Sequence, residues 1–252
     1  MFQKKHIKHS FAYTHTHMQT KNITLVTSVI CPPNRPLSYS YVRSVYTREE
    51  RFEQTKCTLA TIKTQIPDNL IVLVECSPLS PEENAYFTEN TDLLINIYDL
   101  KDKEPDLIDN IYGRSKSMGE GTMTLCALMQ IFANNIIYDN LFKVSGRYWL
   151  NENFDYANFD NDQIVVSYLD EEHLTTNAFT ALYKLPIKYV REWYNHLLGS
   201  GKDFNDCVGY EVIFAKFLQR IKHQYVKNEC IKNIPKIGLS GYVTVCGTLC
   251  ER

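Results

Sequence analysis

The stretch LFKVSGRYWL, residues 141–150, determines how the rest of the chain is interpreted. An apolar run typical of a buried strand stops at Ser145 and Gly146, and Arg147, Tyr148 and Trp149 follow at once. A glycine and a permanent cation at the end of a core strand indicate either a surface turn or a ligand site. The pattern of strands and helices in the remaining sequence favours the second interpretation.

Apolar runs alternate with amphipathic segments along most of the chain. Strands are expected over residues 22–30, 70–77, 91–99, 140–150 and 162–169, with a closing strand within residues 243–250. Helices are expected over residues 47–64, 78–90, 122–135, 187–198 and 209–223, and a polar loop over residues 100–121. Thr47, followed three residues later by Glu50, forms a capping box that would start the first helix. Because the strands are apolar throughout, we expect a single α/β domain whose mostly parallel sheet is covered by helices on both faces.

The composition argues against several classes of protein. At 252 residues, with 44% hydrophobic and 22% charged residues, the chain can bury the core of a globular domain. Its formal charge of -2 argues against a general affinity for nucleic acid, and no apolar stretch reaches the ~20 residues that span a bilayer. The 8 cysteines form no C-x-x-C pair and lie mostly in apolar runs, so we expect reduced thiols and a cytoplasmic protein.

Residues 1–21 form a polar segment that lacks the apolar core of a secretory signal. This segment carries His6, His9, His15 and His17. A polar tail offers a metal ion no fixed geometry, so we expect a flexible leader, with residues 22–252 forming the domain.

Polar side chains collect where the predicted strands end. Parallel sheets bind ligands beyond the carboxyl ends of their strands. We therefore expect a nucleotide site there, in which a carboxylate contacts the ribose or base while cations and helix amides contact phosphate. Gly146 would let the backbone approach the ligand closely. The candidates are Thr27, Ser28, Arg51, Glu75, Ser77, Lys116, Ser117, Glu120, Ser145, Gly146, Arg147 and Tyr148.

Common nucleotide and hydrolase motifs are absent. No G-x-G-x-x-G follows the first strand, and the chain has no G-x-x-x-x-G-K-[ST] phosphate loop. The stretch SKSMGEG, residues 115–121, places its lysine before its glycines, and no G-x-S-x-G nucleophile elbow is present.

Four segments, taken in order, resemble a family of GT-A-type glycosyltransferases found in bacteria and large DNA viruses. They are ITLVTSV, REERFEQTKCTLATIKTQIPDNLIVLVECSPLS, KSMGEG and LFKVSGRYWL. The resemblance covers residues 22–169 and continues more loosely to the helix around Glu211. It implies a GT-A-like, Rossmann-type fold and a transferase that uses a nucleotide-sugar, with UDP or GDP as the nucleotide. Residues 22–150 would hold the donor and residues 151–252 a glycan or other hydroxyl acceptor. A viral member would act in the host cytoplasm.

The resemblance also implies roles for individual residues. Arg147 and Lys116 would neutralise the departing diphosphate, since negative charge grows there as the glycosidic bond breaks. In an inverting enzyme a carboxylate would act as base toward the acceptor hydroxyl, with Glu211 as the first candidate and Asp162 as the second. GT-A enzymes usually carry an Asp-x-Asp metal motif at the end of the fourth strand, where this chain has Ser145-Gly146-Arg147. A cation could replace the metal, or Asp160 and Asp162, which have the motif's spacing, could bind Mn²⁺ or Mg²⁺.

Other interpretations of these residues remain open. Glu75 could cap a helix or form an ion pair, Arg147 could pair with one of the acids that follow it, and Tyr148 and Trp149 could simply pack. Arg51 could be solvated, Lys116 and Glu120 could mark a helix start, and the Asn-rich turn that carries Asp160 and Asp162 could be solvated. A glycan- or partner-binding module without turnover is an alternative to the transferase. A nucleotidyltransferase that makes a nucleotide-sugar is another.

Overall fold

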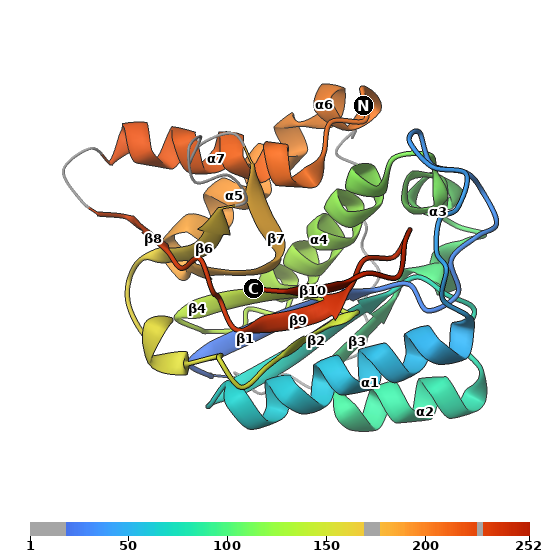
Figure 1. Ribbon diagram of the computed structural model, residues 1–252, viewed down its shortest axis with the longest axis horizontal. Coiled ribbons are helices and arrows are strands. Elements are labelled where there is room, and N and C mark those ends of the chain that lie inside the picture. Colours follow the sequence, from blue (N-terminus) through green and yellow to red (C-terminus); the bar gives the residue numbers. More distant parts are fainter. Residues whose placement is uncertain (1–18, 169–176, 226–228) are drawn as a thin grey trace.

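A 7-stranded sheet forms the centre of the protein in the computed structural model, which describes residues 19–168, 177–225 and 229–252 (Figure 1). The strands lie in the order β3-β2-β1-β4-β7-β6-β8. Their bounds are β1 Asn22–Ser28, β2 Asn69–Glu75, β3 Leu93–Asn96, β4 Asn140–Ser145, β6 Ile164–Tyr168, β7 Ala178–Pro186 and β8 Ile231–Asn233. Only β7 runs antiparallel to its neighbours β4 and β6, so the predicted mostly parallel sheet is confirmed.

Strand β1 lies between β2 and β4 and is parallel to both. Its last residues pair with the last residues of these neighbours, Ser28 with Glu75 and Thr27 with Ser145. Three strands therefore end together at one edge of the sheet, and we call this the carboxyl edge.

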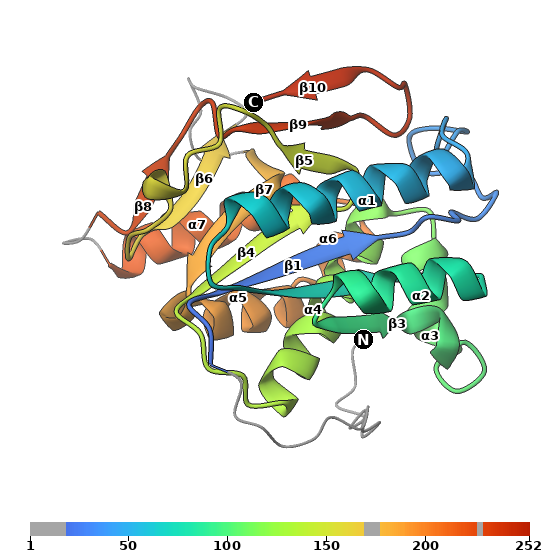
Figure 2. The ribbon, with the colours of Figure 1, turned by 90° about the horizontal axis from the view of Figure 1, so that it is seen from below.

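Helices cover both faces of the sheet (Figures 1 and 2). One face carries α1 Arg48–Gln65 and α2 Pro81–Asn90, and the other carries α4 Lys116–Ala133, α5 Ile187–Gly199 and α7 Tyr210–Gln224. Along β2, Leu70, Val72 and Val74 belong to the core under the second group, and Ile71 and Leu73 to the core under the first. Burial on both faces explains why the strand is apolar throughout, and the predicted α/β class is confirmed.

The start of α1 is as predicted. The Thr47 hydroxyl accepts a hydrogen bond from the Glu50 amide at 3.2 Å, and the Glu50 carboxylate accepts one from the Thr47 amide at 2.7 Å. These two bonds form the capping box that satisfies amides left free at a helix start.

The predicted polar loop over residues 100–121 is wrong. The 3₁₀ turn η1 Ile97–Leu100 ends at its first residue. The stretch contains the helix α3 Pro105–Tyr112 and the first turns of α4, which starts at Lys116 after the N-cap Ser115. The many charged residues concealed the apolar positions Leu107, Ile108 and Ile111, which pack against the core beside α4. The helical N-terminus of α4 therefore lies at the carboxyl edge.

The predicted strand over residues 140–150 is divided in two. Strand β4 ends at Ser145, and after a turn the chain enters β5 Tyr148–Leu150, which belongs to a separate 3-stranded sheet. Its other strands are β9 Leu239–Tyr242 and β10 Leu249–Glu251, so most of residues 243–250, predicted as a closing strand, form the connection between two strands. A short 3₁₀ turn, η2 Tyr156–Asn158, follows β5, and α6 Gly201–Asn205 follows α5.

The last residues of the predicted leader are attached to the domain. The Thr20 hydroxyl donates to the Asp68 carbonyl at 2.7 Å, and the Lys21 amide donates to the Asp68 carboxylate at 2.9 Å. Residues 1–18, with the four histidines, lie outside the described residues. Within the described part of the chain, no helix has the length and apolar character needed to cross a membrane.

We expect Gly121→Ala to destabilise the protein, because Gly121 lets α4 pack closely on Phe204 of α6. An added Cβ would lie 2.4 Å from the ring carbon Cζ of Phe204, which is 1% exposed. Overpacking should lower the free energy of unfolding by ~1–3 kcal/mol, even though alanine favours a helix over glycine by ~1 kcal/mol. Urea unfolding measures this. Gly199→Ala is the matched control, since no atom lies within 4 Å of its added Cβ, and equal stability of the two variants would contradict the prediction.

Candidate functional site

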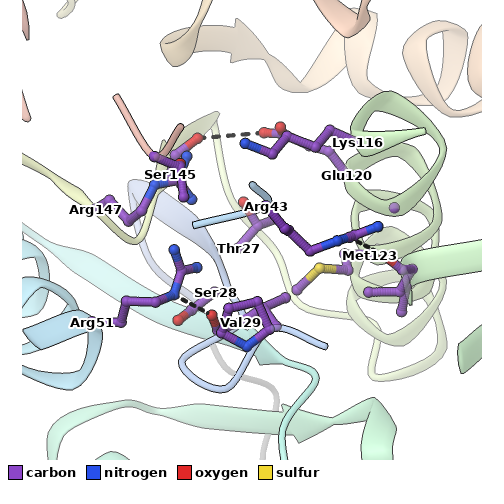
Figure 3. Close-up of a pocket in the computed structure, with 14 residues that line it drawn as sticks. Thr27, Ser28, Val29, Arg43, Arg51, Lys116, Glu120, Met123, Ser145 and Arg147 are labelled. Atoms are coloured by element: carbon purple, nitrogen blue, oxygen red, sulfur yellow. Dashed lines mark hydrogen bonds between the residues drawn. The ribbon is translucent and has the colours of Figure 1, made fainter. Parts of the chain in front are cut away.

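A pocket opens at the carboxyl edge between the loop after β1, the start of α4, and the turn between β4 and β5 (Figure 3). We call it the cationic pocket. Its lining residues are Thr27, Ser28, Val29, Pro32, Arg43, Arg51, Ile111, Lys116, Gly119, Glu120, Met123, Ser145, Arg147 and Thr244. Seven of the residues predicted from the sequence are thereby brought together: Thr27, Ser28, Arg51, Lys116, Glu120, Ser145 and Arg147.

Arg147 lies in the turn directly after β4. Its Nε is buried and has no hydrogen-bond partner, and its guanidinium forms no ion pair with any described residue. The expected alternative, a salt bridge to one of the acids that follow in the sequence, is not formed among the described residues. A buried donor without a partner costs free energy, so this side chain is available to an anion in the pocket.

Gly146 supports the turn rather than the ligand. Its amide donates to the Thr27 carbonyl at 2.9 Å, and its carbonyl accepts from the Thr55 hydroxyl at 2.9 Å. A Cβ at Gly146 would lie 3.0 Å from the Ser28 Cβ. The glycine therefore allows the turn to pack on the end of β1, which corrects the expectation that it lets the backbone approach the ligand.

Two further arginines reach the pocket from other segments. Arg51, on α1, is 4% exposed and donates from Nε to the Val29 carbonyl at 2.7 Å. Burial and the nearby Arg147 charge lower the pKa of Arg51 to about 9, so it is still a cation at neutral pH. Arg43, in the loop before α1, donates to the carbonyl of Tyr112 at 3.0 Å and to that of Gly113, at the end of α3. The carbonyls at a helix C-terminus favour a cation there.

Lys116 is the first residue of α4, and its half-buried side chain crosses toward Ser145 and Arg147 (Figure 3). It makes no hydrogen bond or ion pair with the described residues. Burial lowers its pKa to about 7, and the charges of Arg147, Arg51 and Arg43 add to this effect. Four basic side chains from four segments thus line one pocket, and a bound anion would relieve their repulsion.

Glu120 does not neutralise these cations, because it already has a partner. The fully buried Lys143 on β4 donates to the Glu120 carboxylate, to the Ser145 hydroxyl at 2.7 Å and to the Thr180 carbonyl at 2.9 Å. Burial lowers the pKa of Lys143, and the Glu120 charge opposes that shift. The pair joins α4 to the sheet and leaves the cationic pocket with net positive charge.

A second pocket adjoins the first and shares Lys116, Glu120, Arg147 and Thr244 with it. We call it the adjoining pocket. Its other lining residues are Ser38, Tyr39, Ser115, Ser117, Tyr148, Cys207, Gly209, Tyr210, Glu211, Val243 and Val245. Burial raises the pKa of Glu211, and the Glu120 charge raises it further. The predicted residues Ser117, Tyr148 and Glu211 therefore line this pocket rather than the cationic one.

The aromatic residues after Arg147 mainly pack. Tyr148 is 8% exposed and meets Phe179 edge to face, with ring centroids 6.0 Å apart. Gly241 lies so close that a Cβ there would be 2.2 Å from the Tyr148 ring. The rings of Trp149 and Tyr242 pack with their centroids 5.6 Å apart. Tyr148 thus forms part of a pocket wall that is held by packing.

Glu75 and Ser77 lie beneath the cationic pocket, not in its lining. Both are fully buried, and the Glu75 Oε1 accepts from the Ile30 amide at 3.1 Å and from the Ser77 hydroxyl at 2.6 Å. Burial raises the pKa of Glu75, and Ser77 opposes the shift. The structure gives both residues a supporting position under the loop after β1, in place of the ribose or base contact expected from the sequence.

Asp160 and Asp162 lie at the opposite end of the sheet. Asp160 pairs with Lys21 at 2.8 Å, just before β1 begins, and Asp162 pairs with Lys188, just after β7 ends beside the start of β4. Across residues 19–168, 177–225 and 229–252 no three His, Cys, Asp or Glu side chains are grouped so that they could hold a metal ion. The described residues do not fit the expected Mn²⁺ or Mg²⁺, and we derive no step through a metal.

Arg43, Lys143 and Thr244 are polar residues in or beside this pocket that were not among the candidates from the sequence. Arg43 follows a proline-rich stretch after the first strand. Because parallel sheets bind ligands beyond the carboxyl ends of their strands, a search of the whole loop after this strand would have found it. Lys143 lies within an apolar run. A buried lysine needs a partner, so its place in a core strand could have indicated a buried ion pair. Thr244 comes from the connection between β9 and β10, and no sequence pattern linked that connection to the edge.

The fold and the site define an α/β protein with a cationic pocket at the carboxyl edge of a mostly parallel sheet. No protein-family model matches the sequence, and no curated protein matches it. Among solved structures, the apo form of mouse xyloside xylosyltransferase 1 is similar, at 10% identity and a TM-score of 0.42. The similarity covers 86% of this chain and 85% of that chain. The likeness is distant.

We expect Lys116→Met to stabilise the ligand-free protein and to weaken anion binding. The pKa of Lys116 falls from 10.5 to about 7 on folding, so the unfolded chain binds more protons between these values. The cost of charging Lys116 is therefore fully present below about pH 7 and fades as the pH rises toward about 10. The gain in melting temperature over the unmodified protein should be larger at about pH 6 than at about pH 10.

Pyrophosphate provides the second readout for Lys116. It should raise the melting temperature of the unmodified protein more than that of Lys116→Met, because the variant has lost one of the four cations. Lys202→Met, at an exposed position on α6, is the matched control and should change neither result. A pH-independent effect of Lys116→Met would contradict the prediction.

Proposed function

We propose that this chain is a glycosyltransferase that moves a sugar from a nucleotide-diphospho-sugar, with UDP or GDP as the nucleotide, to a hydroxyl of a glycan or similar acceptor. The observation that carries the proposal is the convergence of Arg43, Arg51, Lys116 and Arg147 on one pocket at the carboxyl edge. A diphosphate is the ligand group that such a cluster suits, because guanidinium groups bind phosphate oxygens in pairs.

The two pockets support separate places for donor and acceptor. Apart from Thr244, the cationic pocket is lined by residues 27–147, within the proposed donor half. From the proposed acceptor half, the adjoining pocket adds Cys207, Gly209, Tyr210, Glu211, Val243 and Val245. Lys116, Glu120 and Arg147 stand where the pockets meet, so the reacting sugar carbon would lie beside them.

The proposed chemistry uses cations to stabilise the leaving group. The bond between the anomeric carbon and the diphosphate breaks through an oxocarbenium-like state, and charge accumulates on the departing phosphate. Arg147, with an unpartnered buried Nε, and Lys116 would bind that charge as it grows. Arg51 and Arg43 would hold the diphosphate from the other segments.

Glu211 is the proposed base toward the acceptor hydroxyl. It lines the adjoining pocket, and burial gives its carboxylate a raised pKa, which makes it a stronger base than an exposed glutamate. Asp162, the second candidate from the sequence, lies at the far end of the sheet and is left out of the proposed mechanism.

Calorimetric titration with UDP- and GDP-sugars, followed by assays of hydrolysis and transfer, tests the proposal. Binding together with sugar release or transfer supports it. Binding without either reaction would favour a glycan- or partner-binding module. Release of pyrophosphate from a nucleoside triphosphate and a sugar phosphate would favour the nucleotidyltransferase.

Arg147→Ala should lower turnover by ~10²-fold or more, on the scale of removing one preorganised donor to developing charge. The donor Kd should change less, because the guanidinium acts most strongly in the transition state. Arg147→Lys should restore activity only in part, since an ammonium lacks the paired donors of a guanidinium. Arg220→Ala, on the surface of α7, is the control. If Arg147→Ala keeps its turnover, the residue has no part in the mechanism. If the variant loses stability in proportion to its loss of activity, the role of Arg147 is packing.

Glu211→Gln should lower transfer by ~10²–10⁴-fold while leaving donor binding intact, because the amide cannot accept the acceptor proton. In the unmodified enzyme, kcat/KM should fall on acidification at a pH above the ordinary carboxyl range, since the pKa of Glu211 is raised. Glu192→Gln, at a half-buried position on α5 outside the lining of both pockets, is the matched control. Full transfer activity in Glu211→Gln would show that another group, or none, removes the proton.

A further inference from the structure

Lys116 differs from the other lysines that the fold buries. The Nζ of Lys143 donates to Ser145 at 2.7 Å, and that of Lys184 donates to the carbonyls of Asn161 and Gln163 at 2.6 Å and 2.7 Å. These bonds occupy both amines and keep them from reagents. The Lys116 amine has no such bond among the described residues, and it lies on the wall common to both pockets.

Charged groups face Lys116 from every side of the pocket. Arg147 comes from the turn after β4, Arg51 from α1 and Arg43 from the loop before it, whereas Glu120 lies one turn further along α4 and is bound to Lys143. Cys246, in the connection between β9 and β10, is also within electrostatic range. Cations therefore dominate the surroundings of this amine.

These surroundings make the amine nucleophilic at neutral pH. Burial and the three guanidinium groups lower the pKa of Lys116 to about 7, so a large share of the molecules carries a neutral amine there. A lysine desolvated beside other cations is one of the arrangements that activate an amine toward carbonyl compounds.

We propose that Lys116 is a covalent modification site for small aldehydes and ketones that carry a phosphate group. The amine lone pair attacks the carbonyl carbon and forms a carbinolamine, which loses one water molecule to give an imine. The reaction needs no oxidant or reductant and reverses when water adds back.

The phosphate directs such compounds to this lysine. Arg51 and Arg147 offer phosphate-binding groups beside the amine, Arg43 adds its charge, and a cleft lined with one sign of charge concentrates ligands of the opposite sign. An uncharged aldehyde lacks this attraction. The modified lysine would occupy the space in which pyrophosphate is expected to bind, so modification and pyrophosphate binding should exclude each other.

The test treats the full chain with pyridoxal 5′-phosphate, traps the imine with borohydride and locates the modified lysine by peptide mass spectrometry. Pyridoxal 5′-phosphate should modify Lys116 at least ~10-fold faster than pyridoxal does, because pyridoxal lacks the phosphate. Pyrophosphate should protect Lys116, and the rate should rise through about pH 7. Arg147→Gln should reduce the preference for the phosphorylated reagent.

Lys116→Arg keeps the positive charge and removes the amine, so it should lose the modification without losing its fold, as circular dichroism would verify. Equal modification of lysines across the surface, equal rates with pyridoxal, or no protection by pyrophosphate would each overturn the inference. None of these readouts depends on sugar transfer. A chain without transferase activity could still be modified at Lys116, and an active transferase could fail to be, so the two proposals are tested separately.

Discussion

The central strand β1 is hydrogen-bonded on both sides to parallel strands, and this pairing places the ends of β1, β2 and β4 at one edge. The turn after β4 can follow that edge closely because Gly146 has no side chain to meet Ser28. The position of Arg147 depends on this close packing. The position of Lys116 depends on α4, which the buried pair between Lys143 and Glu120 joins to β4. The site is thus a consequence of how three strand ends and one helix start are held together.

Holding four cations in one pocket works against stability. Burial and mutual repulsion lower the pKa values of Arg51, to about 9, and of Lys116, to about 7, which means that charging them costs free energy in the folded protein. Carbonyl groups offset part of this cost for two of the four: Arg43 donates to the carbonyls at the end of α3, and Arg51 donates to that of Val29. A concentration of unpaired positive charge that the fold does not need is typical of a site for an anionic ligand.

Much of the architecture could be predicted from the sequence, because burial on both faces makes a strand apolar throughout and a helix apolar at every third or fourth position. The strand β1, the helix α1 with its capping box and the α/β class all follow from such local signals. The division of residues 140–150 between two sheets does not, since an apolar run does not reveal which partner its two ends pair with. The helix α3 was missed because its charged residues concealed a short apolar face.

The sequence by itself determined several of the strands and helices, among them β1 and α1, and that polar residues gather at the strand ends. It determined Arg147, Lys116, Thr27 and Ser28 as candidates for one site, because parallel strands that end at one edge bring their following residues together. Only the tertiary structure decided that Glu75 lies beneath the pocket, that Asp160 and Asp162 lie at the far end of the sheet, and that Arg43 and Thr244 join the lining. The physical reason is that chain order records which residues follow a strand, whereas burial, partners and distance depend on the packing of segments far apart in the chain.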